Sequence, residues 1–375
     1  MNIAINARVL IKDKIEGVGR YVFETSRRLA EQHADHTFYF FFDRPWPDSF
    51  VFSSNVKPVL LRPPARHPVL YIIWFEWSMR LALKKFNIDV LYTPDGFMPL
   101  NTQVPIVMVC HDLVYTHHPN FLPYKDRYYL KKFMPKFLAK ANKVLAVSQF
   151  VKDDIVQQFP HLDAAKIEVA YNALPGDRTN PDPKLESKYN LPNDYFLCIS
   201  SIHPRKNILG LLHAFEIYQN SFGGNYKLIL VGNTYWKLDS EIIQKIEKLL
   251  QNGSLIHLQN VKDQDIVSII CKAKAMMYVS LFEGFGIPIL EGMANGIPVI
   301  TSNITSMPEV AGDAAILVDP YNHLEIAQAM HRITTEPDLV NDLIKKGHER
   351  VKQFNWNTST EIIYKSILAA TNKLK

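Results

Sequence analysis

Cysteine is scarce in this sequence, and the few cysteines are not spaced as disulfide partners or metal ligands. The three cysteines, Cys110, Cys198 and Cys271, lie far apart, and no Cys-x-x-Cys or Cys/His ligand spacing occurs. These absences exclude a disulfide framework and a structural zinc site. Cys110 and Cys198 stand inside apolar runs, so we expect buried, reduced thiols.

Long apolar runs are missing too. No stretch approaches the roughly 18 consecutive apolar residues of a membrane-spanning helix. The first residues pass directly into the strand-like run 2–6, without the charged and apolar pattern of a secretory signal. We therefore expect a cytoplasmic location, with the inner face of a membrane as the alternative.

Two stretches favour contact with anionic lipid. Residues 68–86 combine aromatic side chains with arginine and lysine, and residues 125–143 place a run of basic residues among aromatics. Basic amphipathic helices can lie on an anionic membrane. In the alternative reading, the aromatic stripes belong to the core and the lysines form a solvated face.

Strong charge of either sign is absent. The formal net charge is +5 and the isoelectric point is near 8.8. This balance falls well short of a dedicated nucleic-acid binder and is compatible with an anionic substrate. The 375 residues are too many for one ordinary core and suggest two domains.

Short apolar runs alternate with longer amphipathic stretches, which is typical of parallel sheets covered by helices. Expected strands are 37–42, 90–92, 106–110, 144–147, 195–200, 227–231, 255–258, 275–279 and 298–301, and expected helices are 18–32, 150–159, 208–220, 240–251 and 263–272. A segment rich in proline and glycine, 173–183, is interpreted as a linker. We predict an α/β fold of two doubly wound domains, residues 1–174 and 175–355, with a ligand in the cleft between them and a helical segment at 356–375.

The most informative motif is a pair of carboxylates, Glu283 and Glu291, that bracket Gly284-Phe285-Gly286-Ile287-Pro288. The two glycines let the backbone approach a ligand, and Pro288 suits the first position of a helix. Glu291 would then lie in the first helical turn, beside N–H groups that favour an anion. The two glutamates could simply cap and solvate. The permissive turn between them instead favours a site for a sugar attached to a diphosphate.

A cationic pair, Arg205-Lys206, follows the expected strand 195–200, and Asn207 is a plausible N-cap of the next helix. Arginine offers a planar fork and lysine a mobile charge for phosphate oxygens. Surface loops often carry such pairs without a function. The position at the carboxyl end of a strand favours phosphate binding.

A third glycine is missing from the N-terminal motif Gly17-Val18-Gly19-Arg20-Tyr21, because Val22 stands in its place. This mismatch argues against a nicotinamide dinucleotide fingerprint and hence against a dehydrogenase. A glycine loop at a helix N-terminus still remains, and it could approach a phosphate.

His111 follows the expected strand 106–110, where ligands bind in such sheets. It could bond a sugar hydroxyl or take part in proton transfer. A structural histidine satisfied by a backbone carbonyl is an equally good reading. His111, His117 and His118 lack a tidy metal-ligand spacing, and we expect no Asp-x-Asp metal site for a diphosphate. We therefore expect neither a metal nor a cofactor.

Together these motifs resemble the retaining glycosyltransferases of family four, which have the GT-B fold. The E-x7-E signature is matched by Glu283 and Glu291, and Arg205-Lys206 is similar to the diphosphate clamp of the family. The segments 307–315 and 318–320, and the Gly-x-Gly-Arg-Tyr start, are similar to bacterial surface-polysaccharide members, many of them mannosyltransferases.

The resemblance implies a role for each motif. Glu283 would bind the transferred sugar, Glu291 the ribose, and the cationic pair would stabilise the departing diphosphate. The glycine loop would close over the phosphates, His111 would sit near the sugar, and the final helix would cross back to the N-terminal domain. The implied catalytic residues are His111, Arg205, Lys206 and Glu283, and the implied donor-binding residues are Gly17, Gly19, Arg205, Lys206, Val261, Glu283, Gly284, Phe285, Gly286, Ile287 and Glu291.

The resemblance favours GDP-mannose as the donor, with a UDP-sugar as an alternative, and a glycan or lipid-linked saccharide as the acceptor. A nucleotide-sugar epimerase or a phosphorylase of the same fold remains open. A catalytically silent nucleotide-sugar binder, from another class, remains open as well.

Overall fold

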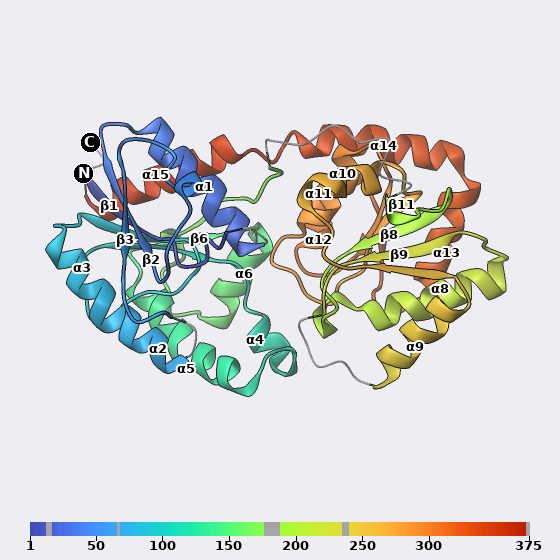
Figure 1. The fold of residues 1–375 in the computed structure, drawn as a ribbon, viewed down its shortest axis with the longest axis horizontal. Coiled ribbons are helices and arrows are strands. Elements are labelled where there is room, and N and C mark those ends of the chain that lie inside the picture. Colours follow the sequence, from blue (N-terminus) through green and yellow to red (C-terminus); the bar gives the residue numbers. More distant parts are fainter. Residues whose placement is uncertain (13–16, 66–67, 176–187, 235–239, 373–375) are drawn as a thin grey trace. The chain divides into compact units, whose positions relative to one another are not determined.

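The computed structural model describes residues 1–12, 17–65, 68–175, 188–234 and 240–372. Internal contacts divide the chain into two units. Unit 1 comprises Met1–Asn172 and Asn355–Lys375, and unit 2 comprises Ala173–Phe354 (Figure 1). Most of the predicted linker, from residue 176 onward, lies outside the described residues.

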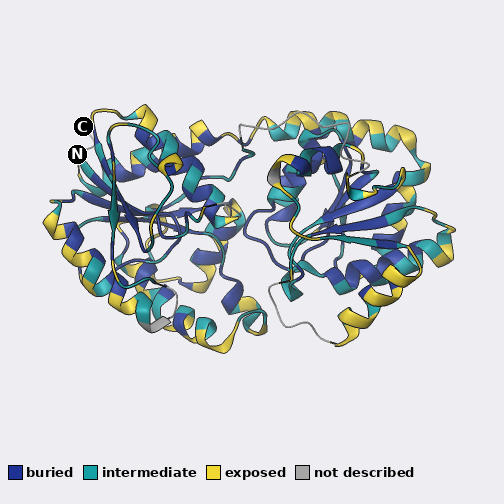
Figure 2. Ribbon diagram, viewed as in Figure 1, coloured by how far each residue is buried: buried dark blue, intermediate teal, exposed yellow. Residues whose placement is uncertain are grey.

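Unit 1 is built on a parallel sheet of seven strands in its described part, in the order β3-β2-β1-β4-β5-β6-β7. The strands are β1 (Asn2–Asn6), β2 (Thr37–Phe42), β3 (Val56–Leu60), β4 (Val90–Thr93), β5 (Ile106–Cys110), β6 (Lys143–Ala146) and β7 (Ile167–Val169). Its central strands are apolar and buried, as strands covered by helices on both faces must be (Figure 2).

The helices of unit 1 are α1 (Val18–Gln32), α2 (Pro68–Ile73), α3 (Arg80–Lys85), α4 (Val114–His117), α5 (Tyr124–Lys140), α6 (Gln149–Gln158) and α15 (Trp356–Ala370). A π-helical stretch, Trp74–Met79, joins α2 to α3. Short 3₁₀ turns lie at Asp48–Phe50, Pro119–Phe121 and Ala164–Lys166. Helix α15 packs against α1, and the Ser359 hydroxyl donates to the carbonyl of Tyr171 at 2.7 Å.

Unit 2 repeats the design with a parallel sheet of six described strands, in the order β10-β9-β8-β11-β12-β13. The strands are β8 (Tyr195–Ile199), β9 (Lys227–Val231), β10 (Leu255–Leu258), β11 (Ala275–Tyr278), β12 (Val299–Ser302) and β13 (Ile316–Val318). The helices are α8 (Ile208–Phe222), α9 (Ser240–Gln251), α10 (Asp263–Cys271), α11 (Ile287–Ala294), α12 (Met307–Ala311), α13 (His323–Thr335) and α14 (Pro337–Val351), with a 3₁₀ turn at Pro204–Lys206.

The prediction of two doubly wound α/β domains is confirmed, with small shifts at the ends of elements. Strand β12 starts at Val299, while the carbonyl of Pro298 accepts a hydrogen bond from the N–H of Met276 at 2.9 Å. The edge strands β3, β7 and β13 were not predicted. They are short or contain polar residues and proline, so they lack the apolar run that marks a central strand.

The order of the strands locates the ligand-binding edge of each sheet. In both units the first strand neighbours the second on one side and the fourth on the other, so the winding direction reverses beside it. The switch lies between β1 and β4 in unit 1 and between β8 and β11 in unit 2. Ligands of doubly wound sheets bind beyond the carboxyl ends of these strands.

At the switch of unit 1, a buried ion pair joins Arg8, which follows β1, to Asp95, which follows β4. The Arg8 guanidinium lies 2.7 Å from Asp95 and stands over the rings of Tyr71 and Phe97. The other carboxylate oxygen of Asp95 accepts from the Asn6 amide at 2.7 Å. Arg8 and Asp95 are both almost fully buried, so removal of either side chain would leave the other charge buried without a partner.

We expect Asp95→Asn to lower the free energy of unfolding by about 3 kcal/mol, because it leaves the Arg8 cation buried without its anion. Denaturant unfolding measures the change. Glu361→Gln is the control, since it removes an exposed carboxylate paired with Lys365 on α15. Equal unfolding midpoints for the two variants would contradict a structural role for the pair.

Candidate functional site

The turn formed by residues 283–286, here called the Glu283 turn, follows β11 at the switch of unit 2 and precedes α11. The chain runs through Glu283 to Gly286, which precedes α11 with a φ of 112°. Only glycine adopts that conformation readily. The Glu283 side chain is buried. Because a buried charge is unfavourable unless it is paired, its carboxylate requires charged partners.

Those partners come from the turn after β8. The Lys206 ammonium lies 2.7 Å from Oε1 of Glu283, and Nη1 of Arg205 lies 3.7 Å from Oε2. His203 supports the 3₁₀ turn, because its Nδ1 accepts from the N–H of Arg205 at 3.1 Å. The N–H of Leu281 donates to the carbonyl of Arg205 at 2.8 Å and ties the two loops together. The structure thus brings together Arg205, Lys206 and Glu283, which the sequence separates by more than 70 residues.

The three charges shape each other's ionisation. Burial opposes the charge of Glu283, but Arg205 and Lys206 outweigh burial and lower the pKa of this carboxyl. Burial lowers the pKa of Lys206, Glu283 opposes that shift, and the nearby Arg205 reinforces it. Two cations and one carboxylate leave one net positive charge, which suits a diphosphate.

Asn207 does not cap α8 with its side chain, contrary to the sequence prediction. It occupies the N-cap position in the left-handed region, with φ 54°. Its side-chain amide instead donates to the carbonyls of Val279, at 3.1 Å, and Pro320, at 2.8 Å. Asn207 therefore connects the turn that carries Arg205 and Lys206 to the residue that follows β11 and to the loop after β13.

The second glutamate lies deeper in its helix than predicted. Helix α11 begins at Ile287, so Pro288 is its second residue and Glu291 its fifth, beyond the first turn. The expectation that Glu291 lies in the first helical turn is wrong by one residue. The half-buried Glu291 still projects from the helix that the turn opens.

Two residues with hydroxyl side chains, Thr305 and Ser306, hold the Glu283 turn by hydrogen bonds. They were not predicted from the sequence. The Ser306 hydroxyl lies 2.9 Å from the carbonyls of both Glu283 and Phe285, and Oγ1 of Thr305 accepts from the N–H of Glu283 at 3.4 Å. Thr305 itself has a φ of 58°. Both follow β12, about 20 residues away, and no local spacing announces them. Phe285 is buried, while Ile287 at the start of α11 is partly exposed.

The loops after β8, β9 and β10 meet at the same edge of the sheet. A Cβ on Gly232 would lie 2.0 Å from the carbonyl oxygen of Ser200, so only glycine fits between these loops. The Asn233 side chain accepts from the N–H of Asn260 at 3.2 Å, one residue before Val261. Val261, one of the implied donor-binding residues, thus follows directly on a residue held at this edge.

In unit 1, the helix that follows the predicted glycine loop contacts the predicted His111 through Tyr21. Gly17 precedes α1 with a φ of 49°, and Gly19 is buried in its first turn. The ring of Tyr21, on the same helix, meets His111 edge-to-face with centroids 5.2 Å apart. Nε2 of His111 lies 2.7 Å from the carbonyl of Pro94, the contact expected of a structural histidine. Burial lowers the pKa of His111, so the neutral ring donates from Nε2 and keeps Nδ1 as an acceptor.

The sequence contains one Asp-x-Asp pair, Asp263-Gln264-Asp265, which the expectation of a metal-free site overlooked. Asp265 is the third residue of α10 and accepts hydrogen bonds from Lys188 and from the Tyr189 hydroxyl. Within the described residues, no group of three or more histidine, cysteine or acidic side chains is placed to hold a metal. Asp265 therefore serves an ion pair.

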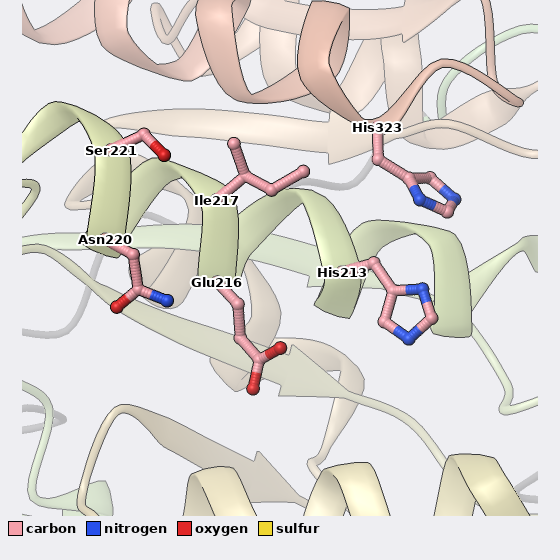
Figure 3. A pocket seen from close by; sticks show the side chains of 6 residues that line it. All are labelled: His213, Glu216, Ile217, Asn220, Ser221 and His323. Atoms are coloured by element: carbon pink, nitrogen blue, oxygen red, sulfur yellow. The ribbon is translucent and has the colours of Figure 1, made fainter.

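One surface pocket of about 360 Å³ contains none of the predicted residues. Its walls come from α8 and from the start of α13 (Figure 3), and are formed by His213, Glu216, Ile217, Asn220, Ser221 and His323. Glu216 is already paired with Lys245 and Lys248. Because this pocket lies along the helices and not at the strand ends, we place the site at the Arg205-Lys206-Glu283 cluster.

That cluster has the features needed to bind a sugar diphosphate. It offers a net positive charge, a carboxylate for hydroxyl groups, and a glycine turn that opens a helix toward an anion. Two Rossmann-like domains with this cluster at one switch point define a glycosyltransferase of the GT-B fold.

Comparison with known proteins identifies the family. Residues 15–178 match the model "Glycosyltransferase Family 4", and residues 182–350 match "Glycosyl transferases group 1". The chain is 30% identical to O-antigen chain mannosyltransferase B of Escherichia coli, over 93% of this chain and 95% of that protein. It therefore belongs to glycosyltransferase family 4.

Solved structures agree on the fold. Sucrose-phosphate synthase from Thermosynechococcus elongatus superposes with a TM-score of 0.78 at 20% identity, covering 99% of this chain and all of that one (100%). The Anabaena protein HepE in complex with UDP-glucose gives 0.76 at 17% identity, covering 98% and 100%. The predictions of the GT-B fold and of the family are confirmed.

Among the described residues, no helix has the length and apolar character to cross a bilayer.

Proposed function

We propose that the protein is a retaining, metal-independent hexosyltransferase that moves mannose from GDP-mannose to a growing surface polysaccharide or lipid-linked saccharide. The observation that carries this proposal is the buried contact of Lys206 and Arg205 with Glu283 at the switch point of unit 2. The relative in Escherichia coli is named an O-antigen chain mannosyltransferase, which favours mannose and a polysaccharide acceptor. The HepE complex contains UDP-glucose, so a UDP-sugar is the alternative donor.

In the proposed reaction, Arg205 and Lys206 bind the diphosphate and Glu283 orients the sugar hydroxyls. An acceptor hydroxyl attacks the anomeric carbon on the face from which the diphosphate departs. The new C–O bond forms as the bond to phosphate breaks, and the hydroxyl proton passes to the departing phosphate. The two cations act most strongly on the charge that develops on this leaving group. Gly17, Gly19 and His111 of unit 1, with Val261 and the turn Gly284–Ile287, complete the proposed donor contacts, and Glu291 takes the ribose.

A panel of nucleotide sugars tests the function. We expect release of nucleoside diphosphate from GDP-mannose, faster with an oligosaccharide acceptor, and a product that keeps the anomeric configuration of the donor. Activity should persist in excess chelator. Release from a UDP-sugar alone would replace the donor assignment, and release from none, with binding retained, would favour the silent binder.

A further part of the proposal concerns an anionic membrane. Helix α2 packs against α5, and large apolar side chains and lysines are exposed on α5, on α3 and on the π-helical stretch between α2 and α3. The apolar-basic face that we propose consists of Trp77, Leu81, Tyr124 and Tyr128, which are 63%, 60%, 71% and 57% exposed, with the exposed Lys84, Lys85, Lys125, Lys131, Lys132 and Lys136. Apolar insertion and attraction to anionic headgroups act together on such a face.

We expect binding to vesicles that contain phosphatidylglycerol, weakened in high salt, and little binding to phosphatidylcholine alone. Trp77→Ser with Leu81→Ser should lower partitioning by roughly tenfold or more, since two apolar side chains leave the lipid. The matched control exchanges Tyr321 and Leu324, which are 61% and 50% exposed on unit 2, for serine. Sedimentation with vesicles measures the binding. An unchanged Trp77/Leu81 variant would rule out this face.

A further inference from the structure

A buried tyrosine, Tyr278, contacts the cationic pair and was not among the predicted site residues. It is the last residue of β11 and is only 3% exposed. Its hydroxyl lies 2.9 Å from the Lys206 ammonium, and that ammonium stands 5.0 Å from the centre of the ring. The Tyr278 hydroxyl thus provides a hydrogen-bond acceptor to this cation.

The surroundings hold this tyrosine in one place. Tyr278 pairs with Thr301 of β12, whose hydroxyl donates to the Tyr278 carbonyl at 2.8 Å. On the other side, a Cβ added to Gly286 would lie 3.4 Å from Cε1 of the ring, so the glycine turn packs against it. Tyr278 therefore links the cation to the turn that carries Glu283.

The chemistry of the hydroxyl suits this place. Lys206 has three N–H donors, and within the described residues Glu283 and Tyr278 take two of them. Burial, and then the Glu283 carboxylate, raise the pKa of Tyr278 well above its ordinary value, so the phenol stays neutral. The neutral hydroxyl accepts a hydrogen bond from Lys206 and leaves the positive charge of the ammonium in place. A second carboxylate in the same position would cancel that charge.

We propose that Tyr278 is a positioning residue that directs the Lys206 ammonium toward the departing diphosphate. The proposal rests on the proposed transferase function. Glu283 alone would tether the ammonium at one point, whereas two acceptors at 2.7 and 2.9 Å fix its direction and leave the third N–H for a phosphate oxygen. Tyr278 has no contact with substrate in this role and acts through Lys206.

Tyr278→Phe tests the proposal, because it removes one oxygen and keeps the ring. We expect kcat to fall roughly tenfold, with the donor KM changed less than about threefold, as expected for a contact that matters most in the transition state. The ionisable groups that act on Lys206 are Glu283, Arg205 and Cys198, together with the Tyr278 hydroxyl that it contacts. Loss of the neutral acceptor destabilises the ammonium and lowers its pKa, so the alkaline limb of the pH–kcat profile should move down by about one pH unit.

Tyr195→Phe is the matched control. Tyr195 is a fully buried tyrosine at the amino end of the neighbouring strand β8, and its hydroxyl donates to the carbonyl of Ile269 at 2.6 Å. A merely structural hydroxyl would lower the thermal midpoint in both variants and leave both pH profiles in place. We expect the alkaline limb to move only in Tyr278→Phe.

A double-mutant cycle gives a second measurement. If Tyr278 acts through Lys206, its substitution should change kcat little further once Lys206→Ala is present. Wild-type kcat and an unmoved alkaline limb in Tyr278→Phe, or an undiminished effect in the Lys206→Ala background, would overturn the proposal. An inactive wild-type protein with every donor would instead refute the transferase function itself.

Discussion

Lys206→Ala should lower kcat by a hundredfold or more. The Lys206 side chain is only 14% exposed and its ammonium stands beside Glu283 at the switch point, where a diphosphate would develop charge as it leaves. Removing one charge-stabilising donor from an enclosed site typically costs about 10²- to 10³-fold in rate. Steady-state release of nucleoside diphosphate at saturating donor and acceptor measures the effect on kcat.

Lys245→Ala provides the comparison. Lys245 is another partly buried lysine of unit 2, 18% exposed, and its partner is Glu216 on α8, which lines the surface pocket away from the strand ends. We expect near wild-type turnover from this variant. Equal losses in both would indicate general destabilisation, and unchanged turnover in Lys206→Ala would remove Lys206 from the mechanism.

The dependence of wild-type activity on pH should reflect the ionisation of Lys206. The cationic form of Lys206 is the active one, and burial holds its pKa below the usual value of 10.5. Activity should therefore decline with rising pH before an ordinary lysine would lose its proton. Glu283 has a pKa below 4.5, so it remains ionised throughout the neutral range.

The candidate site was predictable where its signal is local. Glu283, the glycine turn and Arg205-Lys206 each stand within a few residues of a strand end, and the strand pattern alone places both groups at one edge of a sheet. Alternation of apolar runs and helices likewise predicted the two parallel sheets. Edge strands such as β3 escaped because half-exposed strands lose the continuous apolar run.

The parts that escaped prediction depend on contacts across long stretches of sequence. Tyr278 reaches Lys206 across 72 residues, Asn207 reaches Pro320 across 113, and Arg8 reaches Asp95 across 87. A tyrosine that ends an apolar strand is indistinguishable from a core residue until its neighbour is known. The position of Glu291 failed for another reason, since proline is accepted at the second helical position as well as the first, and one residue shifts the turn.

The two glutamates of the E-x7-E signature should fail in different ways when each is exchanged for glutamine. Glu283 pairs with two cations, so Glu283→Gln places an amide N–H beside the Lys206 ammonium and leaves Arg205 and Lys206 to repel each other. We expect kcat to fall roughly a hundred- to a thousandfold, because the clamp loses its geometry where the leaving group gains charge. Repulsion also lowers the pKa of Lys206, which moves the alkaline limb to lower pH.

Glu291→Gln should instead raise the donor KM by about tenfold and leave kcat within about threefold. In the proposed role, this carboxylate holds the ribose, which does not change between the bound substrate and the transition state, so its loss removes uniform binding. Binding of nucleoside diphosphate by calorimetry should weaken to a similar degree in Glu291→Gln. Matching kinetic losses in the two variants would contradict unequal duties. A reversed pattern, with kcat lost only in Glu291→Gln, would exchange their roles.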